Sequence, residues 1–300
     1  MDPVLKGYLQ LTRPANLPTA VGDILAGVAI AGISMETSFI TTNGIRLFPG
    51  IIFLICATIC LYAAGVVLND VFDRDIDAVE RPERPIPSGL ISAKNASIFG
   101  LSLMTLGIIF AFLTNILSGT VAILLALSIL SYDAYFKRYS IGGPLNMGIC
   151  RALNLILGMS LATTLEHPEY ALIHLVYIFA ITLISRGEVH GNNKKHIIWA
   201  GILYVGVIFA VVKIMPDKPG NPEGYIPFLL LFIFLIFKPL INAYRINSAE
   251  NVKKAVVAGV LSIIALDAVL ASGFANWWLG ILVILLLPLS KFLSGLFSVT

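Results

Sequence analysis

The sequence predicts an all-α membrane protein, a single bundle of nine or ten membrane-spanning helices. Three observations lead to this prediction. Hydrophobic residues make up 58% of the 300-residue chain and charged residues only 12%, a composition that excludes a water-soluble globule. The mean hydropathy is +0.91. Apolar runs of about 20 residues, the length that crosses a bilayer as a helix, recur from one end of the chain to the other.

Short polar or charged connections separate these apolar runs, and each run is expected to form one helix. The ten runs are Pro14–Ile33, Pro49–Leu68, Ala93–Leu113, Thr120–Phe136, Pro144–Ala162, Tyr170–Ser185, Ile197–Met215, Tyr225–Tyr244, Val252–Ala271 and Trp277–Leu296. We treat residues 1–300 as one domain. Two charged connections four runs apart suggest two similar four-helix halves, about 8–140 and 141–245. Residues 274–297 then form either an extra span or an interfacial helix.

The distribution of lysine and arginine predicts the orientation. Alternate connections place fifteen of these residues on one side of the membrane and three on the other, and the richer side is expected to be cytoplasmic. The N-terminus and both charged connections would therefore face the cytoplasm. The net charge of +3 is too small to imply nucleic acid as a partner. Cys56, Cys60 and Cys150 all lie in apolar runs, which argues against a disulfide framework or a zinc site.

The most informative stretch is 69–89, which follows an apolar run and in which nine of 21 residues are charged. On a helix, Asn69, Asp73 and Asp77 share one face with Asp70 at its edge, while Asp75 points away. Oxygen ligands of this kind suit Mg²⁺, which binds through one or two carboxylates and the oxygens of a bound phosphate. Such a charge run is ordinarily a solvated loop. However, acidic side chains stacked on one face repel each other unless a cation joins them.

Two arginines follow these carboxylates. The guanidinium groups of Arg81 and Arg84 match the geometry of phosphate oxygens. Carboxylates, a metal ion and arginines in one short stretch indicate a site for a diphosphate.

The stretch resembles the UbiA-type intramembrane prenyltransferases. Their first aspartate-rich motif, N-D-x-x-D-x-x-x-D, appears as Asn69-Asp70-x-x-Asp73-x-x-x-Asp77, and their R-P-[LI]-P-S-G stretch appears as Arg84-Pro85-Ile86-Pro87-Ser88-Gly89. The resemblance implies a helical bundle around a central cavity. It also implies Mg²⁺-dependent transfer of an isoprenyl group from its diphosphate to an aromatic or otherwise hydrophobic acceptor.

Further family elements follow along the chain. The family's Y-x-x-x-K element implies that Lys137 reaches the diphosphate, although Asp133 stands where the tyrosine is expected. The other interpretation of Lys137 is that it only anchors the chain on the membrane side that is richer in lysine and arginine. The resemblance thus gives Asp73, Asp77, Arg84 and Lys137 catalytic roles, with Arg81 as a further diphosphate ligand.

The family's second aspartate-rich motif, D-x-x-x-D, aligns with Glu188 and Asn192, so one carboxylate is lengthened and the other has lost its charge. We include both in the metal set and expect a second Mg²⁺ to bind more weakly. Arg186 and His190 flank them, His190 being by default a surface histidine. Within the family, these residues, the run 132–135 and the Gly-Pro-Leu-Asn-Met-Gly-x-Cys-Arg segment are most similar to the divergent EboC-type branch.

Several polar side chains interrupt the predicted spans. Asn146, Arg151 and Asn154 are expected to face the bundle interior because exposure to lipid is costly. They either line the cavity or form inter-helix hydrogen bonds, with Gly148 and Gly158 allowing close helix contact. Asn16, Asp133, Arg186 and His190 are further cavity candidates. Asp23 and Asp267 must be buried against partners or protonated.

Two other functions compete with transfer chemistry. A non-catalytic relative would keep the cavity to bind or carry an isoprenoid or another hydrophobic precursor. A CDP-alcohol phosphotransferase has a D-G-x-x-D-G-x-x-A-R signature, but Val71 and Arg74 stand where its first glycines are required. The partners predicted by the preferred function are an isoprenyl diphosphate donor, a hydrophobic or aromatic acceptor and the lipid bilayer.

Overall fold

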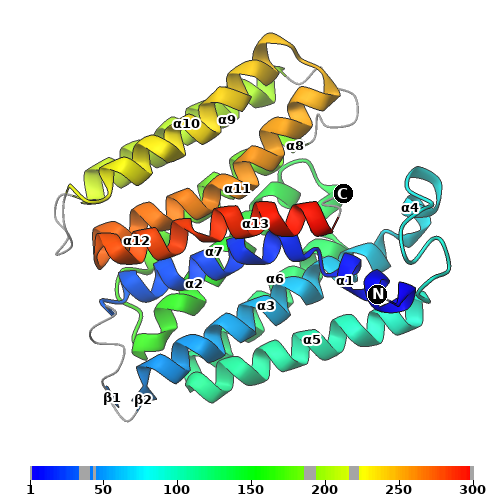
Figure 1. Ribbon diagram of the computed structural model, residues 1–300, viewed down its shortest axis with the longest axis horizontal. Helices are drawn as coiled ribbons and strands as arrows, with labels where there is room; N and C mark the ends of the chain where they lie inside the picture. Colours follow the sequence, from blue (N-terminus) through cyan, green and yellow to red (C-terminus); the bar gives the residue numbers. More distant parts are fainter. Residues whose placement is uncertain (1, 34–40, 43–44, 186–193, 216–222, 298–300) are drawn as a thin grey trace.

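The protein is described here by a computed structural model that covers residues 2–33, 41–42, 45–185, 194–215 and 223–297. The predicted all-α class is confirmed, apart from a hairpin of two two-residue strands (Figure 1). The elements are, in order, α1 (Pro3–Leu11), η1 (Pro14–Asn16), α2 (Leu17–Ile30), β1 (Thr41–Thr42), β2 (Ile45–Arg46), α3 (Leu47–Phe72), α4 (Arg74–Glu80), α5 (Ala93–Thr114), α6 (Ile116–Ala134), η3 (Phe136–Arg138), α7 (Gly142–Met159), η4 (Ser160–Ala162), η5 (Pro168–Tyr170), α8 (Ala171–Ser185), α9 (Lys194–Ile214), α10 (Ile226–Arg245), α11 (Ala249–Phe274), α12 (Trp277–Ile284) and α13 (Leu286–Leu296).

Nine segments within the described residues are long and apolar enough to cross a membrane. They correspond to nine of the ten predicted runs. The remaining run, the first, becomes η1 and the 14-residue helix α2, which at 1.5 Å per residue is only about 21 Å long. Twelve of the fourteen α2 residues are buried, because α3, α7, α11 and α13 pack around it. Helix α2 is therefore a core element of the bundle.

Glycines bring α2 and α7 together backbone to backbone. A Cβ atom on Gly27 would lie 2.3 Å from the carbonyl oxygen of Leu155, and one on Gly158 would lie 2.4 Å from that of Ile24. Gly148 allows an equally close contact between α7 and α8. The predicted packing role of Gly148 and Gly158 is confirmed. This close contact also places the polar side chains of α7 against α2.

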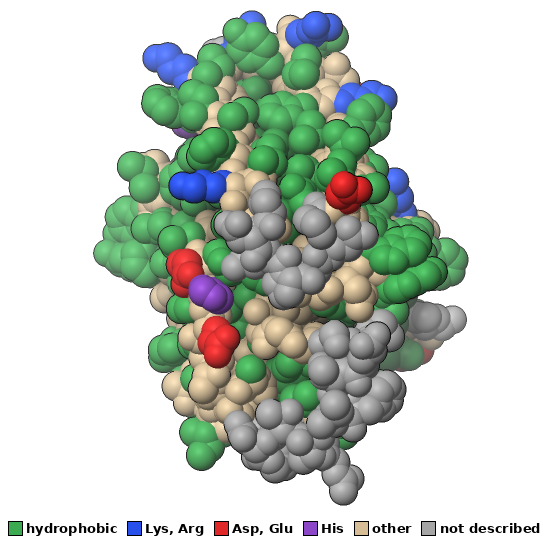
Figure 2. Space-filling model, turned by 90° about the vertical axis from the view of Figure 1, so that its left-hand side faces the viewer, with side chains coloured by type: hydrophobic (Ala, Val, Ile, Leu, Met, Phe, Trp, Pro, Cys, Tyr) green, Lys and Arg blue, Asp and Glu red, His purple; other side chains and the backbone are tan. Residues whose placement is uncertain are grey.

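The outer helices turn large hydrophobic side chains away from the bundle. Leu113 on α5, Phe209 on α9 and Leu230 on α10 are 58%, 69% and 61% exposed. Hydrophobic side chains likewise cover much of the surface seen in Figure 2. Exposed hydrophobic side chains of this size are expected where helices contact lipid.

The C-terminal run is divided into α12 and α13 at Leu285. Together they form one segment, Trp277–Leu296, that is long enough to span. The buried hydroxyl of Ser290 donates a hydrogen bond to the carbonyl oxygen of Ala15, so α13 packs against η1 as well as α2. The C-terminal helix thus packs against the N-terminal part of the chain.

Candidate active site

The candidate site lies at one end of the bundle, where α3 ends and α4 begins. Asp73 stands between the two helices with φ −92° and ψ 3°, a sparsely populated conformation common at active sites. The helical hydrogen bonding nevertheless continues, from Asp73 N–H to the Asn69 carbonyl at 2.9 Å and from Asp77 N–H to the Asp73 carbonyl at 2.8 Å. The motif therefore keeps helical spacing across a local break.

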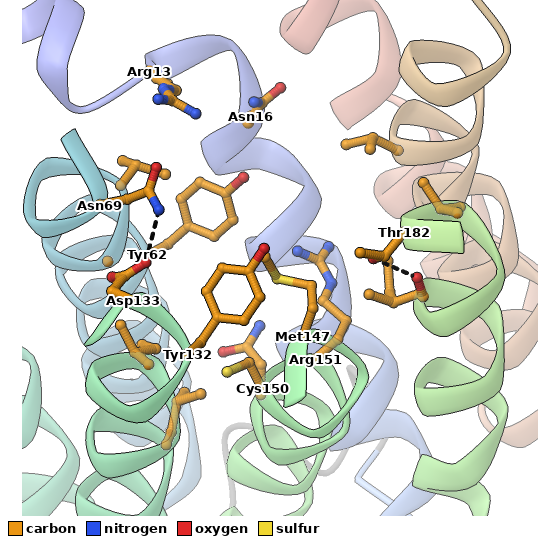
Figure 3. A pocket seen from close by; sticks show the side chains of 18 of the residues that line it. Arg13, Asn16, Tyr62, Asn69, Tyr132, Asp133, Met147, Cys150, Arg151 and Thr182 are labelled. Atoms are coloured by element: carbon orange, nitrogen blue, oxygen red, sulfur yellow. Dashed lines mark hydrogen bonds between the residues drawn. The ribbon is translucent and has the colours of Figure 1, made fainter. Parts of the chain in front are cut away.

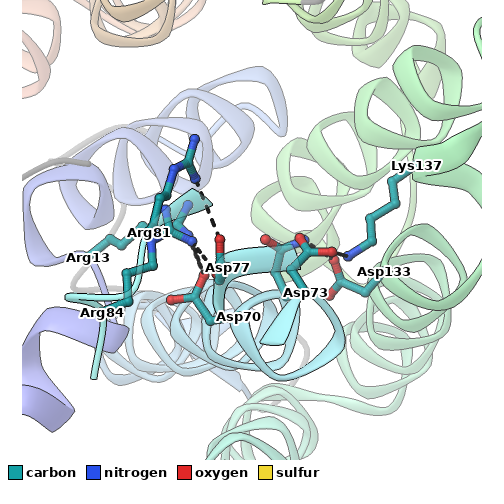
Figure 4. A network of polar contacts seen from close by, with 9 residues as sticks. Arg13, Asp70, Asp73, Asp77, Arg81, Arg84, Asp133 and Lys137 are labelled. Atoms are coloured by element: carbon teal, nitrogen blue, oxygen red, sulfur yellow. Dashed lines mark hydrogen bonds and ion pairs between the residues drawn. The ribbon is translucent and has the colours of Figure 1, made fainter. Parts of the chain in front are cut away.

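Arginines surround two of the motif's carboxylates (Figure 4). Arg84 Nη1 lies 2.6 Å from Asp77 Oδ2 and 3.3 Å from Asp70 Oδ1, so one guanidinium bridges both acids. Arg13 Nη2 lies 2.5 Å from the same Asp70 oxygen. Arg81 is more distant, 4.0 Å from Asp77, and half exposed. Asp70 and Asp77 are both buried, which strengthens their interaction with the arginines.

The Arg-Pro-Ile-Pro-Ser-Gly stretch holds Arg84 in place by folding into a compact turn. Its backbone closes with hydrogen bonds from Ser88 N–H to the Arg84 carbonyl and from Ile91 N–H to the Pro85 carbonyl. Ile86 and Ile91 are buried in a small apolar cluster with Leu11 and Val67. Gly89 has φ +78°, a conformation that favours glycine.

Arg13 reaches the site from the N-terminal segment. Its backbone is left-handed, with φ 46°, and this turns the chain from α1 into η1. Such a conformation is unfavourable for an arginine and persists only where the surrounding structure imposes it. Its ion pair with Asp70 is one such constraint.

A second group of polar side chains lies on the α6 side of the motif. Lys137 Nζ is 2.6 Å from Asp73 Oδ1, and Asn69 Nδ2 donates a 2.8 Å hydrogen bond to Asp133 Oδ1. Asp133 is only 2% exposed. Lys137 follows Asp133 by four residues, so the end of α6 and η3 present both groups to α3.

The structure divides the side chains of the motif between two sets of partners. Asn69, Asp73 and Asp77 keep the predicted helical spacing, but they do not share the same contacts. Asp70 and Asp77 share Arg84, whereas Asn69 and Asp73 contact α6 and η3. Cations on two sides of the motif explain the division, with Arg13 and Arg84 on one side and Lys137 on the other. The outward direction predicted for Asp75 is confirmed, since its side chain is 88% exposed.

A cavity of about 380 Å³ opens beside the motif (Figure 3). Arg13, Asn16, Asn69 and Asp133 line its polar part, and aliphatic side chains from α6, α8 and α11 line much of the remainder. Of the predicted cavity residues, Asn16, Asp133, Arg151 and Asn154 lie in its wall. Asn146 does not, because it accepts a hydrogen bond from Ser128 and donates one to Ser131 on α6.

Arg151 and Asn154 satisfy both interpretations offered by the sequence, since they line the cavity and also bind α2. Arg151 Nε lies 2.6 Å from Asp23 Oδ2, and Arg151 Nη2 donates a hydrogen bond to the Thr19 carbonyl. Asn154 Nδ2 also contacts Asp23, at 2.8 Å.

The buried polar network continues away from the cavity. His174 Nε2 lies 2.7 Å from Asp267 Oδ1 and 3.5 Å from Asp23 Oδ1, and all three side chains are fully buried. Four helices, α2, α7, α8 and α11, thus meet at one polar cluster. The sequence analysis missed His174 as the partner of Asp267, although a histidine within an apolar run was the available signal. Arg13 was likewise assigned no role from the sequence.

Four predicted site residues, Arg186, Glu188, His190 and Asn192, lie outside the described residues. The site is therefore built here from the first motif, its arginines and the α6 side chains. Its donor set is compatible with Mg²⁺: Asn69, Asp73 and Asp133 offer hard oxygen ligands, and Asp133 Oδ2 is buried with no hydrogen-bond partner among the described residues.

Comparison with known proteins supplies independent information. The sequence profile of the UbiA prenyltransferase family matches residues 25–186. A digeranylgeranylglyceryl phosphate synthase from Saccharolobus solfataricus is 31% identical over 238 residues, which cover 79% of this chain and 77% of that protein. A second, from Methanoregula boonei, is 29% identical over 181 residues, covering 60% of this chain and 59% of that protein. The second match thus spans less than two thirds of its relative.

A solved structure shares the fold. The structure of a UbiA homolog from Archaeoglobus fulgidus bound to DMAPP and Mg²⁺ superposes with a TM-score of 0.62 at 14% sequence identity. The superposition covers 84% of this chain and 98% of that one. The resemblance to the EboC-type branch stays a prediction, because these matches do not bear on it.

Proposed function

The chain belongs to the UbiA prenyltransferase family, and from that premise we propose that it transfers an isoprenyl group from a diphosphate donor to a glyceryl phosphate acceptor. Membrane location and prenyl transfer follow from the family and the apolar helices. The acceptor and the roles of individual residues are the proposal.

The observation that carries the proposal is the placement of a dense charge network beside an apolar cavity. Four cations, Arg13, Arg81, Arg84 and Lys137, pair with carboxylates next to this cavity. An isoprenyl diphosphate has the same division, with a highly charged head joined to a hydrocarbon tail. Head and tail can therefore each find a matching environment.

Asn69, Asp70, Asp73 and Asp77 would hold Mg²⁺ in this site. When bound, Mg²⁺ neutralises diphosphate oxygens and helps the diphosphate to leave. In the structure, the three acids of this set are partnered by arginine and lysine. Donor binding would let the cations exchange a carboxylate for a phosphate oxygen, so no charge need be left unpaired at either stage.

Arg84 and Lys137 are the proposed catalytic cations. Arg84 offers a planar fork that can bind two phosphate oxygens, and Lys137 offers a point charge from the opposite side. Both are mostly buried, with side chains 11% and 14% exposed, so their charges act through little water. Fixed cations at the position where negative charge develops stabilise the transition state. Arg81, being half exposed, has a smaller role.

The cavity protects the allylic cation, the other product of bond cleavage, from water. As the diphosphate leaves, positive charge develops on the allylic carbon of the donor, and water would capture it. The aliphatic wall formed by Ile129, Ile178 and Val260 keeps water away from that carbon. A nucleophilic oxygen of the acceptor then forms the new bond and releases its proton.

The relatives suggest the acceptor. The protein from S. solfataricus is by name a synthase of digeranylgeranylglyceryl phosphate, whose product carries two geranylgeranyl groups on glyceryl phosphate. By analogy, a glyceryl phosphate with one isoprenyl chain is our preferred acceptor. An aromatic acceptor, the expectation from the motif resemblance, is the alternative.

Residues outside the described ranges are also included in the proposal. Glu188 and Asn192 would complete a second, weaker metal site, with Arg186 and His190 beside it. We also propose that the charged end of the bundle faces the cytoplasm, on the basis of its lysine and arginine content.

The proposal can be tested with purified protein in lipid nanodiscs. Geranyl, farnesyl and geranylgeranyl diphosphates are offered with Mg²⁺ and either geranylgeranylglyceryl phosphate or 4-hydroxybenzoate, and diphosphate release and product mass are measured. We expect an ether product from the glyceryl phosphate and none after chelation of Mg²⁺. If prenylated 4-hydroxybenzoate is the only product, the acceptor is aromatic and the glyceryl phosphate proposal is wrong. Donor binding without diphosphate release under any condition would support the non-catalytic carrier.

A further inference from the structure

The two sides of the charge network are unequally balanced. On the arginine side, the cations Arg13, Arg81 and Arg84 face the acids Asp70 and Asp77, which leaves one positive charge in excess. On the other side, one cation, Lys137, faces Asp73 and a second acid that was not part of the motif, Asp133. Ionised, these groups leave one negative charge in excess.

Asp133 is the source of this excess. Its side chain is 2% exposed, and it points from α6 toward Asn69 in the cavity wall (Figure 3). One oxygen accepts the hydrogen bond from Asn69 Nδ2 at 2.8 Å. The other oxygen, Oδ2, is buried and has no hydrogen-bond partner among the described residues. Burial of an unsatisfied carboxylate oxygen is unfavourable, so a missing partner is expected there.

The surroundings indicate what that partner is. Asp73 and Lys137 lie within electrostatic reach of Asp133 (Figure 4). Lys137 already contacts Asp73, at 2.6 Å. Two carboxylates and an amide side chain close to one another, with a net negative charge and a nearby cavity, match the oxygen ligands that Mg²⁺ prefers.

We infer that Asp133 is a ligand of the catalytic Mg²⁺, together with Asn69 and Asp73. The division of charge gives the site a direction: the metal binds on the α6 side, and the diphosphate extends from it toward Arg84 and Arg13. Asp77, which Arg84 holds at 2.6 Å, also positions that arginine. This inference rests on the proposed Mg²⁺-dependent function and assigns a residue from a different helix to its metal site.

The test measures metal binding in place of turnover. Full-length protein in nanodiscs is titrated with Mn²⁺ in the presence of inorganic diphosphate, and bound Mn²⁺ is followed by electron paramagnetic resonance. The key variant is Asp133→Asn. It keeps an oxygen that can accept the Asn69 hydrogen bond but removes the charge. We expect its Kd for Mn²⁺ to rise by about 10- to 100-fold, the size of effect seen when the surroundings of a metal site are altered.

A matched control comes from the same charged stretch. Asp75→Asn removes an identical carboxylate, but Asp75 is 88% exposed and contacts Arg74 only at 3.5 Å. We expect its Mn²⁺ affinity to stay within twofold of wild type. Asp133→Glu, which restores the charge on a longer side chain, should recover part of the lost affinity. Wild-type affinity in Asp133→Asn would overturn the inference and make Asp133 a structural, protonated partner of Asn69.

Two further outcomes are decisive. If wild type itself binds no Mn²⁺ with diphosphate, the proposed function fails, which is distinct from failure of Asp133 alone. If Asp133→Asn does not fold, anomalous scattering from Mn²⁺ in wild-type crystals settles the assignment. An ion within about 2.3 Å of an Asp133 oxygen supports the inference, since Mg²⁺ lies about 2.0–2.1 Å from its oxygen ligands. An ion bound only to other residues overturns it.

Discussion

Replacement of Arg84 by glutamine gives the sharpest test of the proposed chemistry. The change keeps a long polar side chain but removes the charge that bridges Asp70 and Asp77. In the proposal, this guanidinium turns to the diphosphate as the donor binds and stabilises the charge that develops when it leaves.

The structure allows the magnitude to be worked out. Loss of one buried donor to a developing anion lowers kcat by about 10²- to 10³-fold, equivalent to about 2.7–4 kcal/mol. The free energy of unfolding of Arg84→Gln should fall by less than this. Asp70 keeps Arg13 at 2.5 Å, but among the described residues Asp77 keeps only Arg81, at 4.0 Å. One incompletely paired buried carboxylate is expected to cost about 1–3 kcal/mol. Arg84→Lys keeps the charge but loses the fork, so we expect an intermediate rate.

The assay is diphosphate release at saturating acceptor over a range of donor concentrations, with thermal unfolding in the same nanodiscs. Arg81→Gln is the matched comparison, because Arg81 is 50% exposed and its ion pair with Asp77 is long. Exposed pairs contribute about 0–1 kcal/mol, so its rate should fall by no more than about fivefold. A folded Arg84→Gln enzyme with kcat within threefold of wild type would refute the assigned role.

Two further predictions concern the bundle that holds the site. Arg151→Leu should lower the free energy of unfolding by about 3–5 kcal/mol, because Asp23 would stay buried without its cation. The double change Asp23→Leu/Arg151→Leu should restore much of this loss, since no buried charge is then left unpaired. Chemical denaturation in detergent measures both, and equal losses in the two variants would contradict the reasoning. Gly158→Ala places a Cβ atom 2.4 Å from a backbone oxygen of α2 and should lower the melting temperature. Gly206 has open space around it, so Gly206→Ala should raise helix stability by up to about 1 kcal/mol. A neutral Gly158→Ala would show that α2 and α7 are not in close contact.

Local sequence was sufficient where the determining interaction is short in range. Helical spacing set the direction of Asp75, and the small size of Gly158 indicated a close helix contact before its partner was known. Apolar length identified nine of the ten runs as spans. The first run was the exception. Its helix, α2, is short because the chain turns at Arg13 and forms η1 first, and neither the turn nor the helices packed around α2 can be predicted from apolar length.

Partners in ion pairs could not be predicted in the same way. His174 and Asp267 are 93 residues apart, and Asn69 and Asp133 are 64 apart, so no periodicity in the sequence relates them. A carboxylate in an apolar run indicates that a partner must exist, since an isolated charge in the membrane is costly. It does not indicate which helix supplies that partner.

The sequence by itself determined the class of this protein, because membrane helices follow from hydrophobic length and a charged motif follows from residue spacing. It also determined which residue types could bind a metal and a diphosphate. Only the tertiary structure decided how those residues are shared out, with Arg84 between Asp70 and Asp77 and with Asn69 beside Asp133. The physical reason is that electrostatic pairing depends on distance in space, and helix packing brings distant parts of the chain within a few ångströms of each other.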